Sequence, residues 1–171
     1  MRWLLLALGL VVLLAVLVAL VGAGLPLRHH ATRKARFRVA PEALYAVMVG
    51  PPDWRSGVKR FGALAEHDGR RQWWEEDQRG QKITYEVMEN VAGKRFAVRI
   101  ADRNLPFGGT WTYDLAPAPG GGSELRISED GEIYNVIYRV VSRFFLGYTA
   151  SMETYLRDLG TKFGQTVEIE P

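Results

Sequence analysis

Apolar residues fill the start of the chain and then give way to alternating and helical patterns. No charged residue lies between Trp3 and Leu27. At about 1.5 Å of rise per residue, roughly twenty apolar residues in a helix cross a hydrocarbon core of ~30 Å. The pattern therefore predicts that residues 1–27 form a transmembrane anchor, which meets the membrane through residues 3–27, and that residues 28–171 form a separate domain.

A cleaved signal peptide is the alternative interpretation of this apolar block. Arg2 gives it a charged start, and Val21–Gly24 offers small residues to a signal peptidase. The block exceeds the usual ~7 to 15 apolar residues of a signal core, which favours an uncleaved anchor. Basic residues are frequent just after the block, whereas only Arg2 and the terminal amine precede it. The positive-inside rule then predicts a single-pass membrane protein with its soluble domain in the cytoplasm.

Alternation of apolar and polar residues predicts a β-rich first part of the domain. A strand is expected over residues 32–40, although its basic residues are also typical of a linker on the membrane surface. Pro41 begins a predicted helix over residues 41–49, and Trp54 lies on a short second helix. Turn signals separate six further strands, over residues 59–67, 71–77, 82–90, 95–102, 109–117 and 124–130. Their short connections predict an antiparallel sheet.

The last predicted strand ends near Glu129, because the Asp-Gly pair that follows breaks the alternation. Over residues 135–164, apolar residues recur every three or four positions, which predicts one helix of roughly 28 residues and about 42 Å. Gly147 inside this helix marks a bend or a close approach of two backbones. The predicted fold class is therefore α+β, with a curved antiparallel sheet wrapped around a long C-terminal helix.

The predicted strands and the long helix share an apolar face that is rich in aromatic residues. One helix across a curved sheet leaves space beneath it, so these residues either pack as core, which periodicity alone favours, or line a cavity. Trp73 and Trp74 must point to opposite sides of their strand, and we expect Trp73 inside. The expected core or ligand-binding side chains are Trp73, Tyr85, Phe96, Val98, Trp111, Tyr113, Ile127, Phe144, Tyr148 and Met152.

Composition and charge limit the classes of function. Residues 28–171 hold 21 Lys and Arg, once Arg2 is set apart from the total of 22, against 19 Asp and Glu, so the net charge is +2. This balance does not indicate nucleic-acid binding. Cysteine is absent, which excludes disulfides and thiolate chemistry. His29 and His30 lie at the membrane edge and His67 at a hairpin, so neither a histidine triad nor a metal site is expected.

Two carboxylates remain as candidate catalytic groups, Glu75 and Glu129. If the strand alternation continues, both point to the apolar face. A buried pair of carboxyl groups with raised pKa values can act as general acid and base. The structural alternatives are that Glu129 pairs with an arginine, or that a bulge at the Asp-Gly pair turns it to solvent. Asp130 and Glu132 are expected in solvent or near the helix N-terminus.

The order of strand, two short helices, six strands and a long helix is the helix-grip order. Four stretches carry a more specific likeness: "APEALYAVMVGPPDWRSGVKRF", "LPFGGTWTYDL", "SEDGEIYN" and "FFLGYTASMETYLRDLG". Over about residues 33–165 the chain resembles the polyketide cyclase/dehydrase-like branch of the START-related SRPBCC superfamily. The resemblance implies a deep apolar pocket between sheet and helix that takes lipids, sterols or polyketides, and in some branches catalyses cyclisation or dehydration. The N-terminal anchor departs from the usual soluble form of the family.

Three hypotheses about function follow. The first, favoured by the lack of a catalytic set, is a membrane-anchored module that binds a hydrophobic or amphipathic small molecule, lipid- or polyketide-like, without a cofactor. The second is a cyclase- or dehydratase-type enzyme that uses Glu75 and Glu129 together with a pocket tyrosine. The third is an interaction module with a closed core. A cavity beneath the C-terminal helix separates the third hypothesis from the first two.

Overall fold

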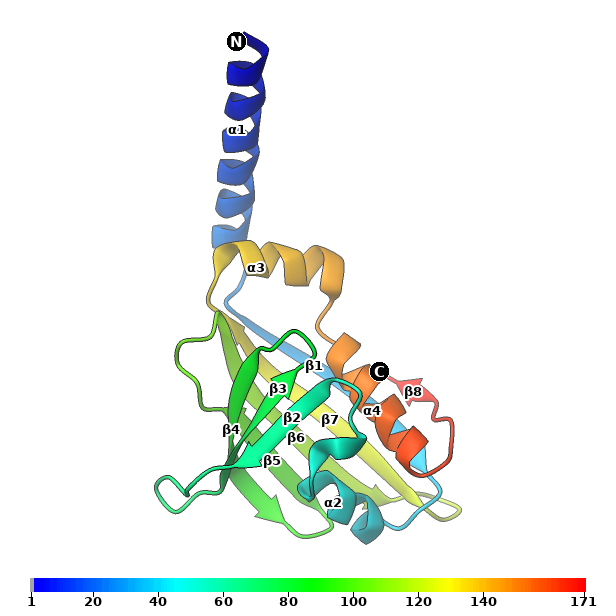
Figure 1. The fold of residues 1–171 in the computed structure, drawn as a ribbon. Coiled ribbons are helices and arrows are strands. Elements are labelled where there is room, and N and C mark those ends of the chain that lie inside the picture. Colours follow the sequence, from blue (N-terminus) through cyan, green and yellow to red (C-terminus); the bar gives the residue numbers. More distant parts are fainter. Residues whose placement is uncertain (1) are drawn as a thin grey trace.

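Eight antiparallel strands form one twisted sheet in the computed structural model, which describes residues 2–171 (Figure 1). The strands are Arg28–Phe37 (β1), Val58–Ala63 (β2), Gln72–Asp77 (β3), Lys82–Val91 (β4), Arg95–Ile100 (β5), Phe107–Pro117 (β6), Ser123–Ile133 (β7) and Ile169–Glu170 (β8). Their order in the sheet is β2-β3-β4-β5-β6-β7-β1-β8. Neighbours from β2 to β7 are consecutive in the chain, as the short turn signals predicted.

The predicted strands are confirmed, with differences at their ends. β1 begins at Arg28 rather than at residue 32, and it pairs with β7 along its whole length, so this basic segment is a strand and not a surface linker. β2 ends at Ala63, well before the predicted end at residue 67. The two-residue strand β8 was not predicted, because so short a segment carries no alternation of its own.

Helices cover one face of the sheet and extend from one end of the domain (Figure 1). They are Arg2–Gly24 (α1), Pro41–Val49 (α2), the short 3-10 helix Pro52–Trp54 (η1), Val136–Val141 (α3), the π-helical turn Ser142–Leu146 (η2) and Ala150–Lys162 (α4). α2 begins at Pro41, whose fixed φ suits the first turn of a helix.

The prediction of one helix over residues 135–164 is wrong. The Asn135 side chain caps α3 by accepting hydrogen bonds from the backbone N–H groups of Ile137 and Tyr138. The helical run then ends at Gly147, which has a φ of 72° and a ψ of 173°, a conformation that side chains rarely adopt. The expected bend at Gly147 is confirmed, and it is sharp enough that α4 starts afresh at Ala150 in a new direction (Figure 1).

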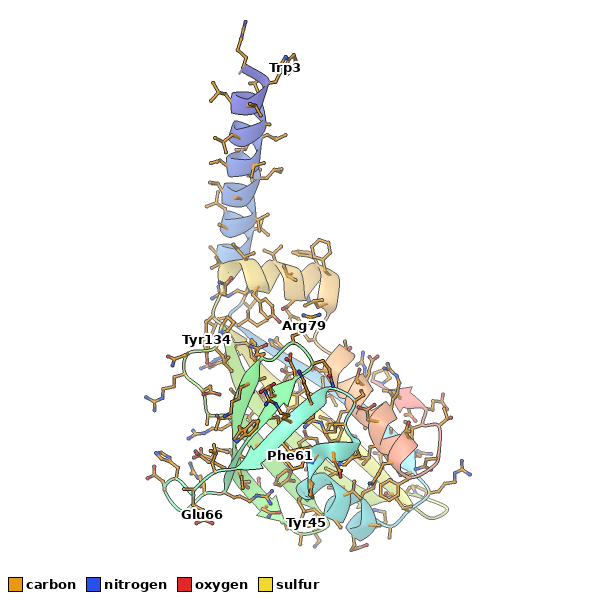
Figure 2. All side chains as sticks on the ribbon, viewed as in Figure 1. Trp3, Tyr45, Phe61, Glu66, Arg79 and Tyr134 are labelled. Atoms are coloured by element: carbon orange, nitrogen blue, oxygen red, sulfur yellow. The ribbon has the colours of Figure 1, made fainter. Side chains whose placement is uncertain are left out.

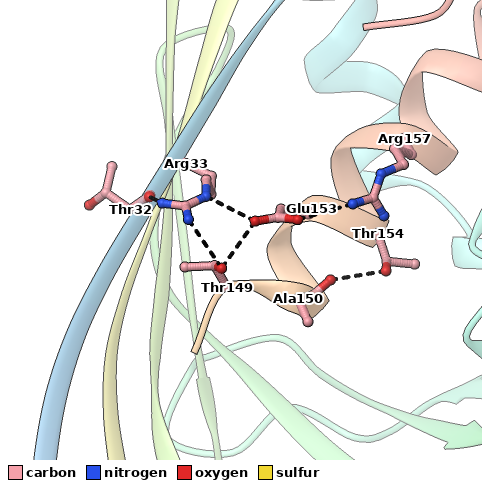
Figure 3. A network of polar contacts seen from close by, with 7 residues as sticks. All are labelled: Thr32, Arg33, Thr149, Ala150, Glu153, Thr154 and Arg157. Atoms are coloured by element: carbon pink, nitrogen blue, oxygen red, sulfur yellow. Dashed lines mark hydrogen bonds and ion pairs between the residues drawn. The ribbon is translucent and has the colours of Figure 1, made fainter. Parts of the chain in front are cut away.

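Side-chain contacts fix the first turn of α4 against β1 (Figure 3). Arg33 on β1 donates from Nε to Glu153 at 3.0 Å and from Nη2 to the Thr149 hydroxyl at 3.2 Å. That hydroxyl donates to Glu153, and Arg157 reaches the same carboxylate from the next turn. The hydrogen bonds from Arg33 and Thr149 lower the pKa of Glu153, so the network stays ionised and holds α4 in place.

The last strand was expected to end near Glu129, but β7 is longer. It continues to Ile133 and pairs with β6 over its whole length and with β1 as far as Glu132. No shift of register interrupts either pairing within the described residues, so the alternative of a bulge at the Asp-Gly pair does not hold. Gly131 is therefore a strand residue, and a Cβ atom there would collide with the His29 ring on the neighbouring strand. Gly131 leaves space for the His29 side chain and does not end the strand.

The core lies between the sheet and helices α2 and α4. α4 contributes Met152, Tyr155, Leu156 and Leu159, and Leu44 on α2 is also fully buried. Full burial of each such side chain contributes roughly 1.5–3 kcal/mol. The core is centred on α4 and leaves α3 and η2 outside it.

α1 is long and apolar enough to cross a membrane. It is 23 residues long, or about 34 Å, and its side chains, with Trp3 at the tip, stand clear of the domain (Figure 2). The helix ends at Gly24 rather than at residue 27, and only Leu25–Leu27 separates it from β1. Met1 of the predicted anchor lies outside the described residues.

Candidate functional site

A cavity of about 340 Å³ lies between the sheet and the segment that joins α3 to α4. Its apolar lining consists of Trp73, Ile83, Tyr85, Val98, Ile100, Phe107, Trp111, Tyr113, Ile133, Tyr138 and Tyr148. Its charged and hydroxyl-bearing lining consists of His29, Arg55, Glu75, Glu129, Glu132, Ser142 and Ser151. The aromatic face is thus only partly filled by the core, and the cavity that the resemblance implied is present.

Stacked aromatic side chains build the cavity wall. Trp73 and Tyr85 lie on adjacent strands with ring centroids 5.5 Å apart and planes 24° apart. Phe107 stacks on Tyr138 of α3 at 6.0 Å, which ties the sheet to the helix above it. Trp74 points to the opposite side of its strand, where the Lys82 ammonium lies 4.0 Å from its ring centroid. The prediction that Trp73 points inward is confirmed.

A buried ion pair occupies one side of the cavity. Arg55 Nη1 donates to both carboxylate oxygens of Glu75 at 2.8 Å, and the Trp73 indole N–H donates to Oε1 at 3.0 Å. Burial, the largest single influence, opposes the charge on Arg55, but the Glu75 carboxylate and three nearby tyrosines together outweigh it and raise the pKa of Arg55. Glu75 points inward as predicted, yet its oxygens are occupied by these donors. It orders Arg55 and Trp73 rather than standing free as an acid or base.

Glu129 and His29 form a second polar group in the cavity. His29 Nε2 lies 3.7 Å from Glu129 Oε1, too long for a hydrogen bond, and the His29 ring stacks on Tyr148 at 4.0 Å. Burial raises the pKa of Glu129, although a hydrogen bond from Trp111 acts in the opposite direction. Burial, together with the neighbouring His30, lowers the pKa of His29. Both shifts favour the neutral forms. A neutral Glu129 carboxyl group can donate a proton, and a neutral His29 ring can accept one.

The sequence alternatives for Glu129 are settled by these contacts. Glu129 points inward, and its ionisable neighbour is His29 rather than an arginine, so the alternative of an arginine pairing does not hold. Asp130 is exposed and contacts His30 at 2.8 Å, as expected for a solvated carboxylate. Glu132 lies at the rim, where it accepts from Arg28.

We expect the Glu129→Gln variant to change how stability depends on pH. The raised pKa of Glu129 means that the folded state prefers the protonated carboxyl group. This preference adds to the free energy of unfolding in full below the unfolded pKa of about 4.3, and the addition is lost as pH rises through the folded pKa. The variant should therefore match the wild type in acid and become progressively more stable than it as pH rises. Urea unfolding at a series of pH values measures this difference, and a constant difference would contradict it.

Three tyrosines keep their hydroxyl protons in this site. Burial, the largest cause, raises the pKa of Tyr85, Tyr113 and Tyr155 well above the ordinary value. Arg55 acts against this rise in each of them but does not cancel it. Tyr85 and Tyr113 line the cavity, so each presents a hydroxyl group that can both donate and accept a hydrogen bond.

A second hollow of about 320 Å³ lies beyond the Arg55–Glu75 pair, which lines both spaces. Its lining includes Phe96 and Trp54. The Trp54 indole N–H is buried and has no hydrogen-bond partner within residues 2–171. The ion pair therefore forms a polar partition between two largely apolar spaces.

The structure brings together most of the predicted ligand-binding residues. Those that line the main cavity are Trp73, Tyr85, Val98, Trp111, Tyr113 and Tyr148. Phe96 faces the second hollow, and Ile127 and Met152 are fully buried core residues. Phe144 was wrongly placed at the cavity: its side of η2 faces away from the domain and leaves it 61% exposed, whereas Ser142 on the same turn lines the cavity.

The sequence did not predict several residues of the cavity lining, among them His29, Arg55, Tyr138 and Ser142. His29 was assigned to the membrane edge, although the alternation of Phe37 and Ala35, extended backward along β1, would have placed it inside. Arg55 lies in a loop without periodicity, so no signal marked it. Among residues 2–171 no group of three His, Asp or Glu side chains is placed to hold a metal ion.

No protein-family model matches the chain, and no curated protein matches its sequence. Solved structures share its fold. A conserved protein from Geobacillus kaustophilus has a TM-score of 0.64 at 13% identity, covering 84% of this chain and all (100%) of that one. Norcoclaurine synthase from Thalictrum flavum, solved in complex with dopamine and hydroxybenzaldehyde, has a TM-score of 0.61 at 10% identity, with 80% and 86% covered.

The di-domain ARO/CYC StfQ from the steffimycin biosynthetic pathway has a TM-score of 0.62 at 13% identity, over 79% of this chain and 50% of that one. At such low identity these likenesses show the fold alone. They support the helix-grip fold, with an antiparallel sheet and a C-terminal helix. The finer assignment to the polyketide cyclase/dehydrase-like branch stays a prediction.

Proposed function

We propose that this protein binds a hydrophobic small molecule that carries hydroxyl or carbonyl groups, while α1 holds the domain at a membrane with its soluble part in the cytoplasm. The observation that carries the proposal is the cavity of about 340 Å³, lined by stacked aromatic side chains with a polar group on either side. Its volume is within the ~300–1,000 Å³ typical of small-molecule sites.

The cavity lining favours a flat, uncharged ligand. Trp73 and Trp111 contribute aromatic surface to the cavity lining. Arg55 is already neutralised by Glu75, so the site has no free cation to attract a strongly anionic group. Tyrosine hydroxyls and the Glu129–His29 pair offer hydrogen bonds to oxygen atoms of a ligand. The aromatic molecules in the norcoclaurine synthase complex, which has the same fold, are consistent with a ring-bearing ligand.

We expect the full chain, purified in lipid nanodiscs, to retain a small molecule that mass spectrometry detects in organic extracts. The Ile100→Trp substitution adds a large side chain to the cavity lining and should reduce the retained amount by about tenfold or more, the effect of ~1.4 kcal/mol of lost binding. Val91→Trp, at an exposed position of β4, is the matched control and should retain the molecule. A molecule retained equally by all three proteins, or by none, would contradict binding in the cavity.

A cyclase- or dehydratase-type enzyme is the second candidate function. The Glu129–His29 pair favours it, since burial shifts both pKa values toward neutral forms that can exchange a proton. Glu75 is less suited to this role because Arg55 and Trp73 occupy its oxygens. Extracts of Glu129→Gln distinguish the candidates: an enzyme should retain a different, unreacted molecule, whereas a binding protein should retain the same one as the wild type.

A further inference from the structure

We propose that the α3–η2 segment, residues 136–146, lies in the surface of the bilayer beside α1 and inserts its exposed apolar side chains at the boundary between headgroups and acyl chains. The inference rests on the proposed insertion of α1 in a membrane. It adds a second point of contact with the bilayer, and it determines which wall of the cavity faces the bilayer.

The segment exposes large apolar side chains that no part of residues 2–171 covers. Ile137 is 51% exposed, Phe144 61%, Phe145 79% and Leu146 55%. Such a cluster on the surface of a domain marks a site of contact with another apolar surface. The three consecutive residues Phe144–Leu146 form the densest part of it.

Direct contacts fix the segment across the base of α1. A Cβ atom on Gly22 would collide with the carbonyl group of Val136, so the two backbones touch. Arg139 donates to the carbonyl oxygens of Gly22 and Leu25 at 3.4 Å, and to that of Ile133 at 2.7 Å. A cation at the C-terminus of a helix is favourable, because the last carbonyl groups carry partial negative charge.

This geometry identifies the bilayer as the surface that covers the cluster. Figure 1 shows α3 running crosswise to α1 at the point where α1 meets the domain. When α1 crosses the hydrocarbon core, the segment therefore lies parallel to the membrane and at its surface. The apolar surface of α1 and the exposed residues Phe144–Leu146 then meet one continuous apolar phase.

The chemistry of the segment suits a membrane interface. Aromatic residues are favoured at the level of the headgroups, and an interfacial helix buries its apolar face by about 5–10 Å. Arg143 is exposed beside Phe144 and can bind anionic headgroups, which attract each basic residue by roughly 1 kcal/mol. Tyr138 and Ser142 point the other way and line the cavity.

The orientation places one wall of the cavity against the bilayer. Tyr138 and Ser142 belong to the segment, and Gly147 and Tyr148 follow it directly, and all four line the cavity. A ligand dissolved in the membrane would therefore need to pass only this segment to enter the cavity.

The absence of cysteine allows each position to be labelled alone. The full chain is reconstituted in phosphatidylcholine vesicles with a minor fraction of phosphatidylglycerol, and the depth of a nitroxide label is measured by electron paramagnetic resonance. Phe145→Cys reports on the segment, Leu13→Cys on the middle of α1, and Glu66→Cys on the far end of the domain (Figure 2). We expect the Leu13→Cys label in the hydrocarbon core, the Phe145→Cys label about 5–10 Å below the headgroup surface, and the Glu66→Cys label in water.

Each other outcome has a distinct meaning. A buried Leu13→Cys label with a Phe145→Cys label in water overturns the insertion of the segment and leaves α1 as a membrane span. A Leu13→Cys label in water overturns both the membrane part of the proposed function and this inference. Adding Arg143→Glu to Phe145→Cys should move the label toward water in these vesicles but not in pure phosphatidylcholine, and equal depth in both overturns the role of Arg143.

Discussion

The Arg55→Met variant is expected to lose about 3 kcal/mol of unfolding free energy, because it leaves the buried Glu75 carboxylate without its cation. The expected loss is at the lower end of the ~3–5 kcal/mol typical of broken buried ion pairs, because the Arg55 side chain is still 26% exposed to solvent. Urea unfolding of the full chain in a nonionic detergent, followed by tryptophan fluorescence, measures it. Removal of both charges in Arg55→Met with Glu75→Leu should recover most of the loss.

A neighbouring ion pair, which joins β2 to the residue after Glu75 on β3, provides a matched control for this prediction. Arg60 and Glu76 form an ion pair of similar geometry, at 2.7 Å, but on the side of the sheet where the Arg60 side chain is 65% exposed. Arg60→Met should therefore cost only about 0–1 kcal/mol. Equal losses in Arg55→Met and Arg60→Met would show that burial does not distinguish the two pairs.

The Gly109→Ala variant is expected to lose about 2 kcal/mol or more. Gly109 has a φ of 137°, which costs a residue with a side chain about 1–3 kcal/mol. An added Cβ atom would also lie 2.5 Å from the Asp130 carbonyl oxygen and 2.8 Å from the Gly131 Cα atom, where backbone atoms must shift. The loss should appear in urea unfolding together with weaker retention of the cavity ligand, because Gly109 lines the cavity.

The neighbouring glycine is the control for Gly109. A Cβ atom on Gly108 would meet the hydroxyl end of the exposed Tyr134 side chain, which can shift at the cost of its hydrogen bond to Glu132. Gly108→Ala should therefore lower the unfolding free energy by only about 0.5–1.5 kcal/mol, the net contribution of one hydrogen bond. A loss at position 108 as large as that at position 109 would mean that neither strain nor backbone contact explains the effect.

Alternation was the signal that predicted the sheet and much of the cavity wall. In β3 to β6 each strand has a period of two, so the inward direction of Trp73, Tyr85, Trp111 and Tyr113 followed from their positions. Glu75 was placed correctly by the same argument. These strands pair with their neighbours in sequence, so a local pattern was sufficient to predict which side chains point inward.

The remaining errors come from residues whose role depends on contacts distant in sequence. Gly131 resembles a turn residue, yet it is a strand residue that leaves space for His29 on β1. Gly147 was expected to bend a helix, but periodicity cannot show that the apolar face of η2 leaves the domain altogether. Arg55 comes from a loop, and only the folded sheet brings it to Glu75.

Under the proposed function, the short connection Leu25–Leu27 limits how far the domain can carry a bound molecule. Three residues reach about 11 Å at full extension, and the hydrogen bond from Arg139 to Leu25 shortens that reach. With α1 embedded, the domain cannot ferry a molecule between two membranes as a free carrier does. Any onward handover must occur where the molecule was collected, either to a recipient that approaches that membrane or back into the lipid itself.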